Sequence, residues 1–242
     1  VSDDVILSQT TPRVDFDNGS AGSFRLFSVS ENAAAMTITS AGALSATSFN
    51  GIPFFTDVPN QSMYTHDVSA TDLNAAQNSA YGFLSLDAIT TGDNNTAIGF
   101  QAGTQSTSAS QNTLIGALAG DALTEGGGNV AIGYEALSTE DTTGGGVAIG
   151  YRALKSQNAN ADAYNVAVGY SAGAAVTTGF QNTLIGGLAG DALTIGVANV
   201  ALGYSALGTS VDGDYNTAIG FKALEDYEDG DGDGHNTAIG AN

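Results

Sequence analysis

The sequence predicts an all-β fold, a parallel β-solenoid (β-roll) built from coils of about 17 residues. A nine-residue phrase, N-[TV]-[AL]-[IVL]-G-x-x-A-[LG], recurs along most of the chain. Its copies are evenly spaced, except that the step after Gly146 is two positions longer and the step after Asn216 three positions longer. A fixed period of this kind indicates stacked structural units. The copies begin at Asn78 (a degenerate one), Asn95, Asn112, Asn129, Gly146, Asn165, Asn182, Asn199, Asn216 and Asn236.

A longer period overlies the first. The phrase QNTLIGxLAGDALT begins at Gln111 and again at Gln181, and NVA-[IL]-GYxAL begins at Asn129 and again at Asn199. Each of the first four full copies therefore has a counterpart among the next four. Because random low complexity does not produce such a block, we interpret the repeat as a real structural unit.

Three segments follow from this pattern. Residues 1–50 lack the period, and short apolar stretches at 5–7, 14–16, 24–29 and 36–38 predict a β-rich meander or prism. We expect this part to be an N-terminal shaft or attachment segment. Residues 51–77 contain Pro53 and Pro59 without a strong strand pattern, which favours a connector and cap, with at most one helical turn. Residues 78–242 form the predicted solenoid domain.

Each copy contains a three-residue strand between Asn and Gly, as in Thr96, Ala97 and Ile98. Alternate strand residues point to opposite sides, so positions two and four of the phrase share one side and position three takes the other. Neither side is polar. We therefore expect one side to fill the coil, with an interior of Ile, Val, Leu and Ala, and the other to pack against another chain. A coil of this length predicts two short strands and two turns.

Asn and Gly form the predicted framework of the repeat. Glycine at position five indicates a corner that needs positive φ or close approach of coils. Asparagine at position one predicts either a hydrogen-bonded ladder along the stack or a simple turn residue. The framework residues are Asn95, Gly99, Asn112, Gly116, Asn129, Gly133, Gly150, Asn165, Gly169, Asn182, Gly186, Asn199, Gly203, Asn216 and Gly220.

Charge and composition exclude several functions. The formal net charge is -20, with 25 acidic residues against five Lys and Arg, which argues against nucleic acid and disfavours anionic membranes. The chain contains no cysteine, so it has no disulfide or thiolate metal site. Its apolar runs are too short for a transmembrane helix, and no cleavable signal segment is visible.

The copies NTAIGFQAG at Asn95 and NVAIGYEAL at Asn129, with turns such as STEDTTGGG, resemble the repeat region of bacteriophage tail-fibre and tail-spike proteins. Arrays of the NTAIGYxAL type in that family often precede an endosialidase-type intramolecular chaperone. Residues 11–44 also resemble the β-rich shaft ahead of such arrays. Similar coils occur in the heads of trimeric autotransporter adhesins, which are left-handed β-rolls. The resemblance implies a homotrimer that is virion-borne or extracellular.

Two departures bear on this resemblance. No chaperone or membrane-anchor domain follows Asn242, so we expect a processed product, a fragment or one part of something longer. No signal peptide or autotransporter stalk is visible, which favours the phage family over the adhesins.

The segment EDYEDGDGDGHN lengthens the last full step of the repeat. Its alternating Asp and Gly predict a calcium site at Asp229, Asp231 and Asp233, because carboxylates are ligands for Ca²⁺. A solvated acidic loop is the alternative, since the segment matches neither the twelve-residue EF-hand loop nor the calcium-binding nonapeptide repeat. Asp212 and Asp214 belong to the corresponding turn of the preceding coil.

Aromatic residues recur at position six of the phrase. Such a row packs ring on ring or against a partner chain, or it stacks on sugar rings. Ala117 and Gly187 interrupt the row at the same point of each four-coil block, and a leucine that follows each gap is expected to fill it. The row comprises Phe100, Tyr134, Tyr151, Tyr170, Tyr204 and Phe221.

Catalysis has little support. His66 and His235 are the two histidines, and no nucleophile elbow, HExxH motif or phosphate loop is present. Paired carboxylates that cleave glycans remain an alternative. We expect a non-enzymatic virion component, a rigid spacer and host-attachment element of a phage tail fibre. Its partners would be its own copies, other tail or appendage proteins and a host surface glycan or protein. The alternatives are a bacterial trimeric adhesin or filament subunit at the cell surface and a glycan-degrading tail spike.

Overall fold

The structure, a computed structural model, describes residues 74–227 and 234–242 in full and, upstream of them, the backbone of eight strands. Contacts divide the chain into two units, residues 1–55 and 56–242. The first unit contains an antiparallel sheet in the order β1-β2-β3-β4, which confirms the predicted meander. Residues 5–7 lie outside the described part. The strands of this unit are β1 (Arg13–Asp17), β2 (Ser23–Phe27), β3 (Ala34–Ile38), β4 (Leu44–Ala46), β5 (Ser48–Phe49) and β6 (Ile52–Pro53).

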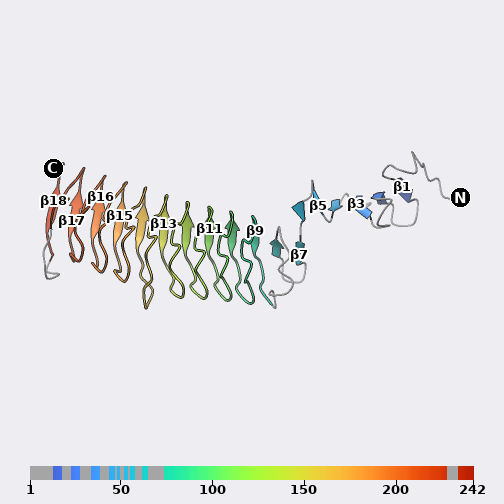
Figure 1. Cartoon of the computed structure of the whole chain (residues 1–242), viewed down its shortest axis with the longest axis horizontal. Helices are drawn as coiled ribbons and strands as arrows, with labels where there is room; N and C mark the ends of the chain where they lie inside the picture. The colour runs from blue at the N-terminus through green and yellow to red at the C-terminus, as the bar shows by residue number, and fades with distance from the viewer. Residues whose placement is uncertain are drawn as a thin grey trace. The chain divides into compact units, whose positions relative to one another are not determined.

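The second unit is a β-solenoid whose strands form one sheet in sequence order from β7 to β18 (Figure 1). From β8 onward, neighbouring strands pair in parallel and join equivalent positions of neighbouring coils. The predicted parallel solenoid, with coils of the predicted length, is therefore confirmed. The strands are β7 (Phe55–Asp57), β8 (Ser62–Tyr64), β9 (Ser79–Tyr81), β10 (Thr96–Ile98), β11 (Thr113–Ile115), β12 (Val130–Ile132), β13 (Val147–Ile149), β14 (Val166–Val168), β15 (Thr183–Ile185), β16 (Val200–Leu202), β17 (Thr217–Ile219) and β18 (Thr237–Ile239).

Residues 51–77, predicted as a connector and cap without a strong strand pattern, nevertheless include strands. This segment contains β6, β7 and β8, and β8 pairs in parallel with β9, so the sheet starts upstream of Asn78. The open edge of a parallel sheet offers unpaired backbone N–H and C=O groups. An extended segment satisfies these groups through its own backbone, and it needs no apolar alternation to do so.

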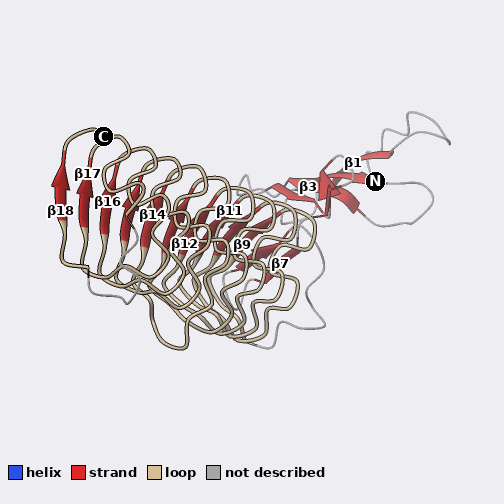
Figure 2. Cartoon of the chain, turned by 60° about the vertical axis from the view of Figure 1, so that its left-hand side comes forward, coloured by secondary structure: helices blue, strands red, loops and turns tan. Residues whose placement is uncertain are grey.

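Each coil contains one strand, and the prediction of two strands per coil is also wrong. Figure 2 shows the strands along one side of the solenoid and loops around the rest of each coil. The loops still stack, because single backbone bonds join equivalent turns: Leu86 N donates to Ala102 O at 3.0 Å, and Gly103 N donates to Ala119 O at 3.0 Å. Left-handed residues at fixed points of each turn prevent a second extended stretch.

The glycine at position five meets both conditions that the sequence predicts. Gly116 has a φ of +130°, a region that side chains rarely adopt. A Cβ added there would lie 2.5 Å from the carbonyl oxygen of Gly133 in the next coil. The corner is thus reserved for glycine by conformation and by the close approach of two backbones.

Leucine occupies left-handed positions inside the coil. Leu137 has a φ of +53° and Leu154 a φ of +48°, and both side chains are fully buried. A left-handed conformation costs an L-residue roughly 1–2 kcal/mol. Burying a leucine side chain contributes about 1.5–3 kcal/mol, which offsets that cost. Packing therefore decides a conformation that local preference opposes.

The interior consists mostly of Ala and Leu, and Ile89 and Val176 are also fully buried in it, as the sequence predicts. From β9 to β17, the middle residue of each strand, position three of the repeat phrase, points inward and is buried, as at Ala131, whereas positions two and four of the phrase point outward. Positions three and nine of the repeat phrase fill the same interior space, so a leucine at one of them is accompanied by a small residue at the other. Leu114 is paired with Gly120 in one coil, and Ala131 is paired with Leu137 in the next. A Cβ on Gly120 would lie 2.8 Å from Leu114 Cδ2.

The predicted asparagine ladder is present along the stack. Asn112 donates its backbone N–H to Asn95 Oδ1 at 3.0 Å and its side-chain amide to Gly126 O at 3.0 Å. The asparagines of the ladder are buried. Asn112 thus binds its counterpart in the preceding coil and a turn of its own coil, which satisfies backbone groups that would otherwise lie in the interior unpaired.

Gly146 interrupts this ladder, and Gln157 replaces the missing amide. Gly146 N still donates to Asn129 Oδ1 at 2.9 Å, but Asn165 Nδ2 donates to Gln157 Oε1 at 2.8 Å. Gln157 in turn donates from Nε2 to Glu140 Oε2 at 3.0 Å. Gln157 and the fully buried Glu140 are equivalent residues of adjacent coils, so the stack aligns a polar pair at a position where most other coils carry an aliphatic residue or a serine.

Candidate interaction surface

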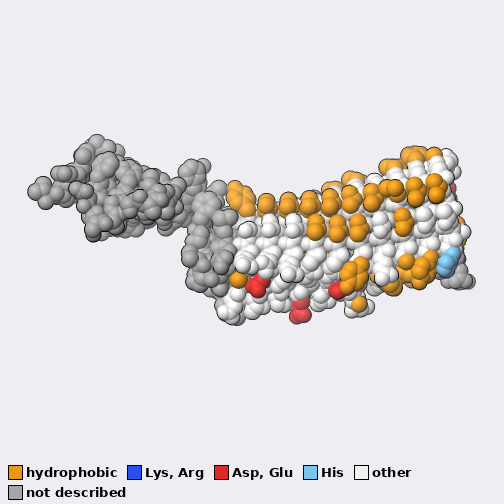
Figure 3. Space-filling model, turned by 180° about the vertical axis from the view of Figure 1, so that it is seen from behind, with side chains coloured by type: hydrophobic (Ala, Val, Ile, Leu, Met, Phe, Trp, Pro, Cys, Tyr) orange, Lys and Arg blue, Asp and Glu red, His pale blue; other side chains and the backbone are white. Residues whose placement is uncertain are grey.

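The outward face of the parallel sheet is apolar along its length. The last residue of each strand, position four of the repeat phrase, is Tyr, Ile, Val or Leu. The first residue of each strand, position two of the phrase, is Thr or Val, with one Ser. Figure 3 shows a continuous apolar row along the solenoid with shorter apolar patches beside it. Ile98 is 42% exposed and Leu202 is 44% exposed. A flat row of half-exposed apolar side chains is typical of a surface that another chain covers.

The aromatic row lies beside this face, and its rings stack on each other. Ring centroids are 5.5 Å apart for Tyr134 and Tyr151 and 5.1 Å apart for Tyr151 and Tyr170, with interplanar angles of 16° and 7°. Phe83 with Phe100 and Tyr204 with Phe221 form two further pairs. The prediction that each ring packs on its neighbour is confirmed for these pairs, yet the rings remain substantially exposed.

An ion cluster accompanies the aromatic row near its middle. Glu135 Oε2 accepts a hydrogen bond from Arg152 Nε at 2.8 Å and lies 2.6 Å from Lys155 Nζ. The Lys155 ammonium, with Tyr134 and Arg152, lowers the pKa of Glu135 from 4.5 to about 2. The bond to Glu135 raises the pKa of Tyr134. This cluster was missed at the sequence level, although Arg152 follows Glu135 by one period of the repeat.

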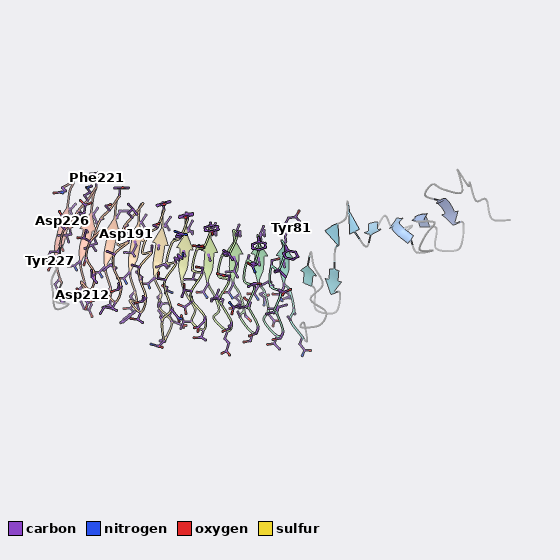
Figure 4. All side chains as sticks on the ribbon, in the orientation of Figure 1. Tyr81, Asp191, Asp212, Phe221, Asp226 and Tyr227 are labelled. Atoms are coloured by element: carbon purple, nitrogen blue, oxygen red, sulfur yellow. The ribbon has the colours of Figure 1, made fainter. Side chains whose placement is uncertain are left out.

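Cations of this surface lie over rings of the row. The guanidinium carbon of Arg152 is 5.0 Å from the Tyr151 ring centroid, and Lys222 Nζ is 5.8 Å from the Phe221 ring centroid. Lys222 also pairs with Glu225 at 2.9 Å. Figure 4 places Phe221 at one edge of the solenoid and Asp212 at the opposite edge. The row is therefore an apolar strip with charged groups beside it.

The acidic turns have a structural use in the described part of the chain. Asp214 Oδ1 accepts a hydrogen bond from Val197 N at 2.7 Å, and Asp93 Oδ1 accepts one from Ala76 N at 2.7 Å. Each carboxylate thus satisfies a backbone donor of the preceding coil.

The predicted calcium ligands, Asp229, Asp231 and Asp233, lie outside the described residues, so calcium remains a prediction. Within residues 74–227 and 234–242, no three His, Asp or Glu side chains come together in a way that could hold a metal ion. The same ranges contain no helix with the length and hydropathy needed to cross a bilayer.

Burial raises the pKa of two aspartates at equivalent places of the duplicated blocks, Asp121 and Asp191. They lie four coils apart along the solenoid and do not form a carboxylate pair. The pKa of both aspartates is raised because both occupy the same place in the repeat, the LAGDALT turn.

Comparison of this chain with protein-family models, with curated proteins and with solved structures finds no match.

Proposed function

We propose that this chain is a structural segment of a homotrimeric phage tail fibre, where it acts as a rigid spacer and host-surface attachment element without enzymatic activity. The observation that carries the proposal is the outward apolar row of the sheet beside a backbone that is hydrogen-bonded from coil to coil. The resemblance of the repeat to tail-fibre arrays supplies the biological setting, with the virion tail as location.

Rigidity follows from the stack. Neighbouring coils are joined by strand pairing, by the asparagine ladder and by threonine hydroxyls such as Thr107 Oγ1, which donates to Thr124 O at 3.0 Å. Bending the rod would stretch several of these bonds in each coil at once. A spacer needs this property, because it must hold its distal part at a fixed distance from its base.

Self-association follows from the sheet face. A single chain has a thin interior, mostly of Ala and Leu, and the Ile and Val side chains of its strands point outward. Burying these side chains between chains adds about 25 cal/mol per Å² of apolar surface removed from water. Three copies that share this face would also present weak surface contacts in triplicate, which raises the avidity for a host surface.

The first experiment is the native mass by light scattering, with and without EDTA. We expect about three times the 24.2 kDa chain mass in both conditions. In the variant Ile149→Glu, a charge in the outward row should reduce the mass to that of one chain. Asn160→Glu, in an exposed turn, is the matched control and should remain a trimer. A monomeric wild type with an intact β signal in circular dichroism would refute the homotrimer.

Attachment and catalysis are tested separately. The fluorescently labelled trimer should bind whole bacteria of a susceptible host, and the cell-bound fraction should fall when surface glycans or proteins are stripped. Incubation with purified surface polysaccharide should release no oligosaccharides. Release of oligosaccharides would contradict the non-enzymatic assignment and favour a glycan-degrading spike.

A further inference from the structure

The aromatic row has a gap at Gly187. Tyr170 precedes this gap and Tyr204 follows it, each at position six of its own coil. Strands of neighbouring coils lie about 4.8 Å apart, so the two rings are separated by two spacings, about 9.6 Å. This is the distance at which one group can contact both ring faces.

The backbone does not require glycine at position 187. Its φ lies outside the left-handed region, and a Cβ there would meet its nearest atom, Tyr204 Cδ2, at an ordinary 3.5 Å. The equivalent position of the first block carries a methyl group, Ala117. The missing side chain therefore does not serve the conformation of the coil, and the Tyr204 ring borders the space that it leaves, with Cδ2 and Cε2 3.5 and 3.8 Å from the position of an added Cβ.

Ring exposure indicates that this space is open. Tyr151 has a stacked neighbour on both sides and is 37% exposed, whereas Tyr170 has one on the side of Tyr151 and is 60% exposed. Tyr204, on the other side of the gap, is 49% exposed. Leu188, which was expected to fill the gap, is only half-buried. From Phe100 to Phe221, the ring of Tyr170 is the most exposed of the row, although Phe83 in the first coil is more exposed still, at 66%.

The same row already accommodates cations. Arg152 and Lys222 lie over the rings of Tyr151 and Phe221 in their own coils. The residue that follows Gly187 is the uncharged Leu188, so this coil carries no cation at that point. A net charge of -20 attracts cationic ligands over the whole molecule and repels anionic ones.

We infer that the gap between Tyr170 and Tyr204 binds a quaternary ammonium group, such as the trimethylammonium of a choline-bearing surface component. A nitrogen at the centre of the gap would lie about 4.8 Å from each ring, within the distance of about 6 Å at which a ring attracts a cation. This inference rests on the proposed attachment role and names a ligand class for it.

The trimethylammonium group suits this site better than a primary ammonium group. Its methyl groups match the apolar ring faces, and it has no N–H donors that would lose their water partners on binding. Glycine at the base of the gap leaves room for the methyl groups. The charged side chains beside the row place it at the rim of the sheet face, where a ligand from solvent can reach it.

The test uses choline and its uncharged carbon analogue, 3,3-dimethylbutan-1-ol, added to the full chain at constant ionic strength. Choline methyl protons held between two ring faces should shift upfield in the NMR spectrum, and the analogue should show no saturable shift. Equal binding of both compounds, or of neither, would overturn the inference. Vesicles of phosphatidylcholine, compared with free choline, show whether a lipid headgroup or the soluble compound is preferred.

Variants locate the site. Gly187→Tyr restores the ring that other coils carry and should abolish choline binding, whereas the matched change Ala117→Tyr in the other gap should leave it unchanged. Tyr170→Leu should weaken binding about fivefold, the loss of one ring face, and Tyr170→Phe should retain it. Choline binding that survives Gly187→Tyr would overturn the site. So would a fall of the native mass to one chain in that variant, since it would mean that a second copy occupies the gap.

The failures of the two proposals are distinguishable. If the protein binds host cells but not choline, the ligand assignment fails and attachment stands. If it binds choline but not cells, the site stands and the attachment role fails.

Discussion

Alanine at Gly116 tests the central feature of the stack, which is the contact of one coil's corner with the next. Gly116 has a φ of +130°, and its added methyl group would lie 2.5 Å from Gly133 O and 2.7 Å from Gly133 C. These atoms belong to the backbone of a hydrogen-bonded coil, so neither can rotate away as a side chain would.

Two costs add at this position. The disfavoured φ contributes about 1–3 kcal/mol, and the overlap with the neighbouring backbone contributes about 1–3 kcal/mol more. We therefore expect Gly116→Ala to lower the free energy of unfolding by about 2–6 kcal/mol. Because domains of ordinary size are stable by only about 5–15 kcal/mol, the change should be large on any scale of measurement.

Two other glycines separate these costs. Gly128 has a φ of +71° and open space around it, so Gly128→Ala carries the conformational cost alone, roughly 1 kcal/mol. Gly187→Ala carries neither cost and should lie within about 0.5 kcal/mol of the wild type.

Urea unfolding at one fixed protein concentration, followed by circular dichroism, measures all three variants. Equal midpoints for Gly116→Ala and Gly128→Ala would refute the argument from coil contact, provided that the slope of the transition is unchanged.

Three further outcomes follow from the same structure. Asn182→Ala removes the acceptor of Asn199 N and the donor to Gly196 O, both buried, and should cost about 2–4 kcal/mol in urea unfolding; no loss would contradict a structural ladder. Leu114→Ala should lower the free energy of unfolding by about 2–5 kcal/mol, and Gly120→Leu should also lower it, because the new side chain crowds Leu114. The double variant reproduces the Ala and Leu pattern of the next coil and should recover part of the lost stability. Additive losses in the double variant would contradict the idea that the two positions share one interior volume. Since the pKa of Glu135 is lowered from 4.5 to about 2, its stabilising contribution is present above pH 4.5 and disappears as the pH falls through 2. Glu135→Gln should therefore make the melting temperature less dependent on pH across that interval, and it should cost less than about 1 kcal/mol of stability at pH 7. A melting temperature with the same pH dependence as the wild type would contradict the ion cluster.

The framework of the solenoid was predictable because of its translational symmetry. In a stack of equivalent coils, each residue lies beside its counterpart one period away, so a recurring Asn95 and Asn112 predict a contact between them. The same reasoning predicts the close approach of Gly116 and Gly133. It would also have found Glu135 with Arg152, had charges been compared at the spacing of the repeat.

The interior was not predictable in the same way. Leu137 at a φ of +53° and Gln157 in place of a ladder asparagine both follow from the space available inside a coil. Local preference places leucine in extended or right-handed backbone, and only the enclosed volume reverses this.

The sequence by itself determined that this chain is a stack, how long each coil is, and which asparagines and glycines hold neighbouring coils together. Tertiary structure alone decided which side of each strand faces inward and that each coil has a single strand. It also decided how far the rings beside the gap at Gly187 are exposed. The physical reason is that periodicity fixes contacts along the stack, whereas inside and outside depend on the path of each turn. That path is set by the packing of buried side chains against left-handed backbone.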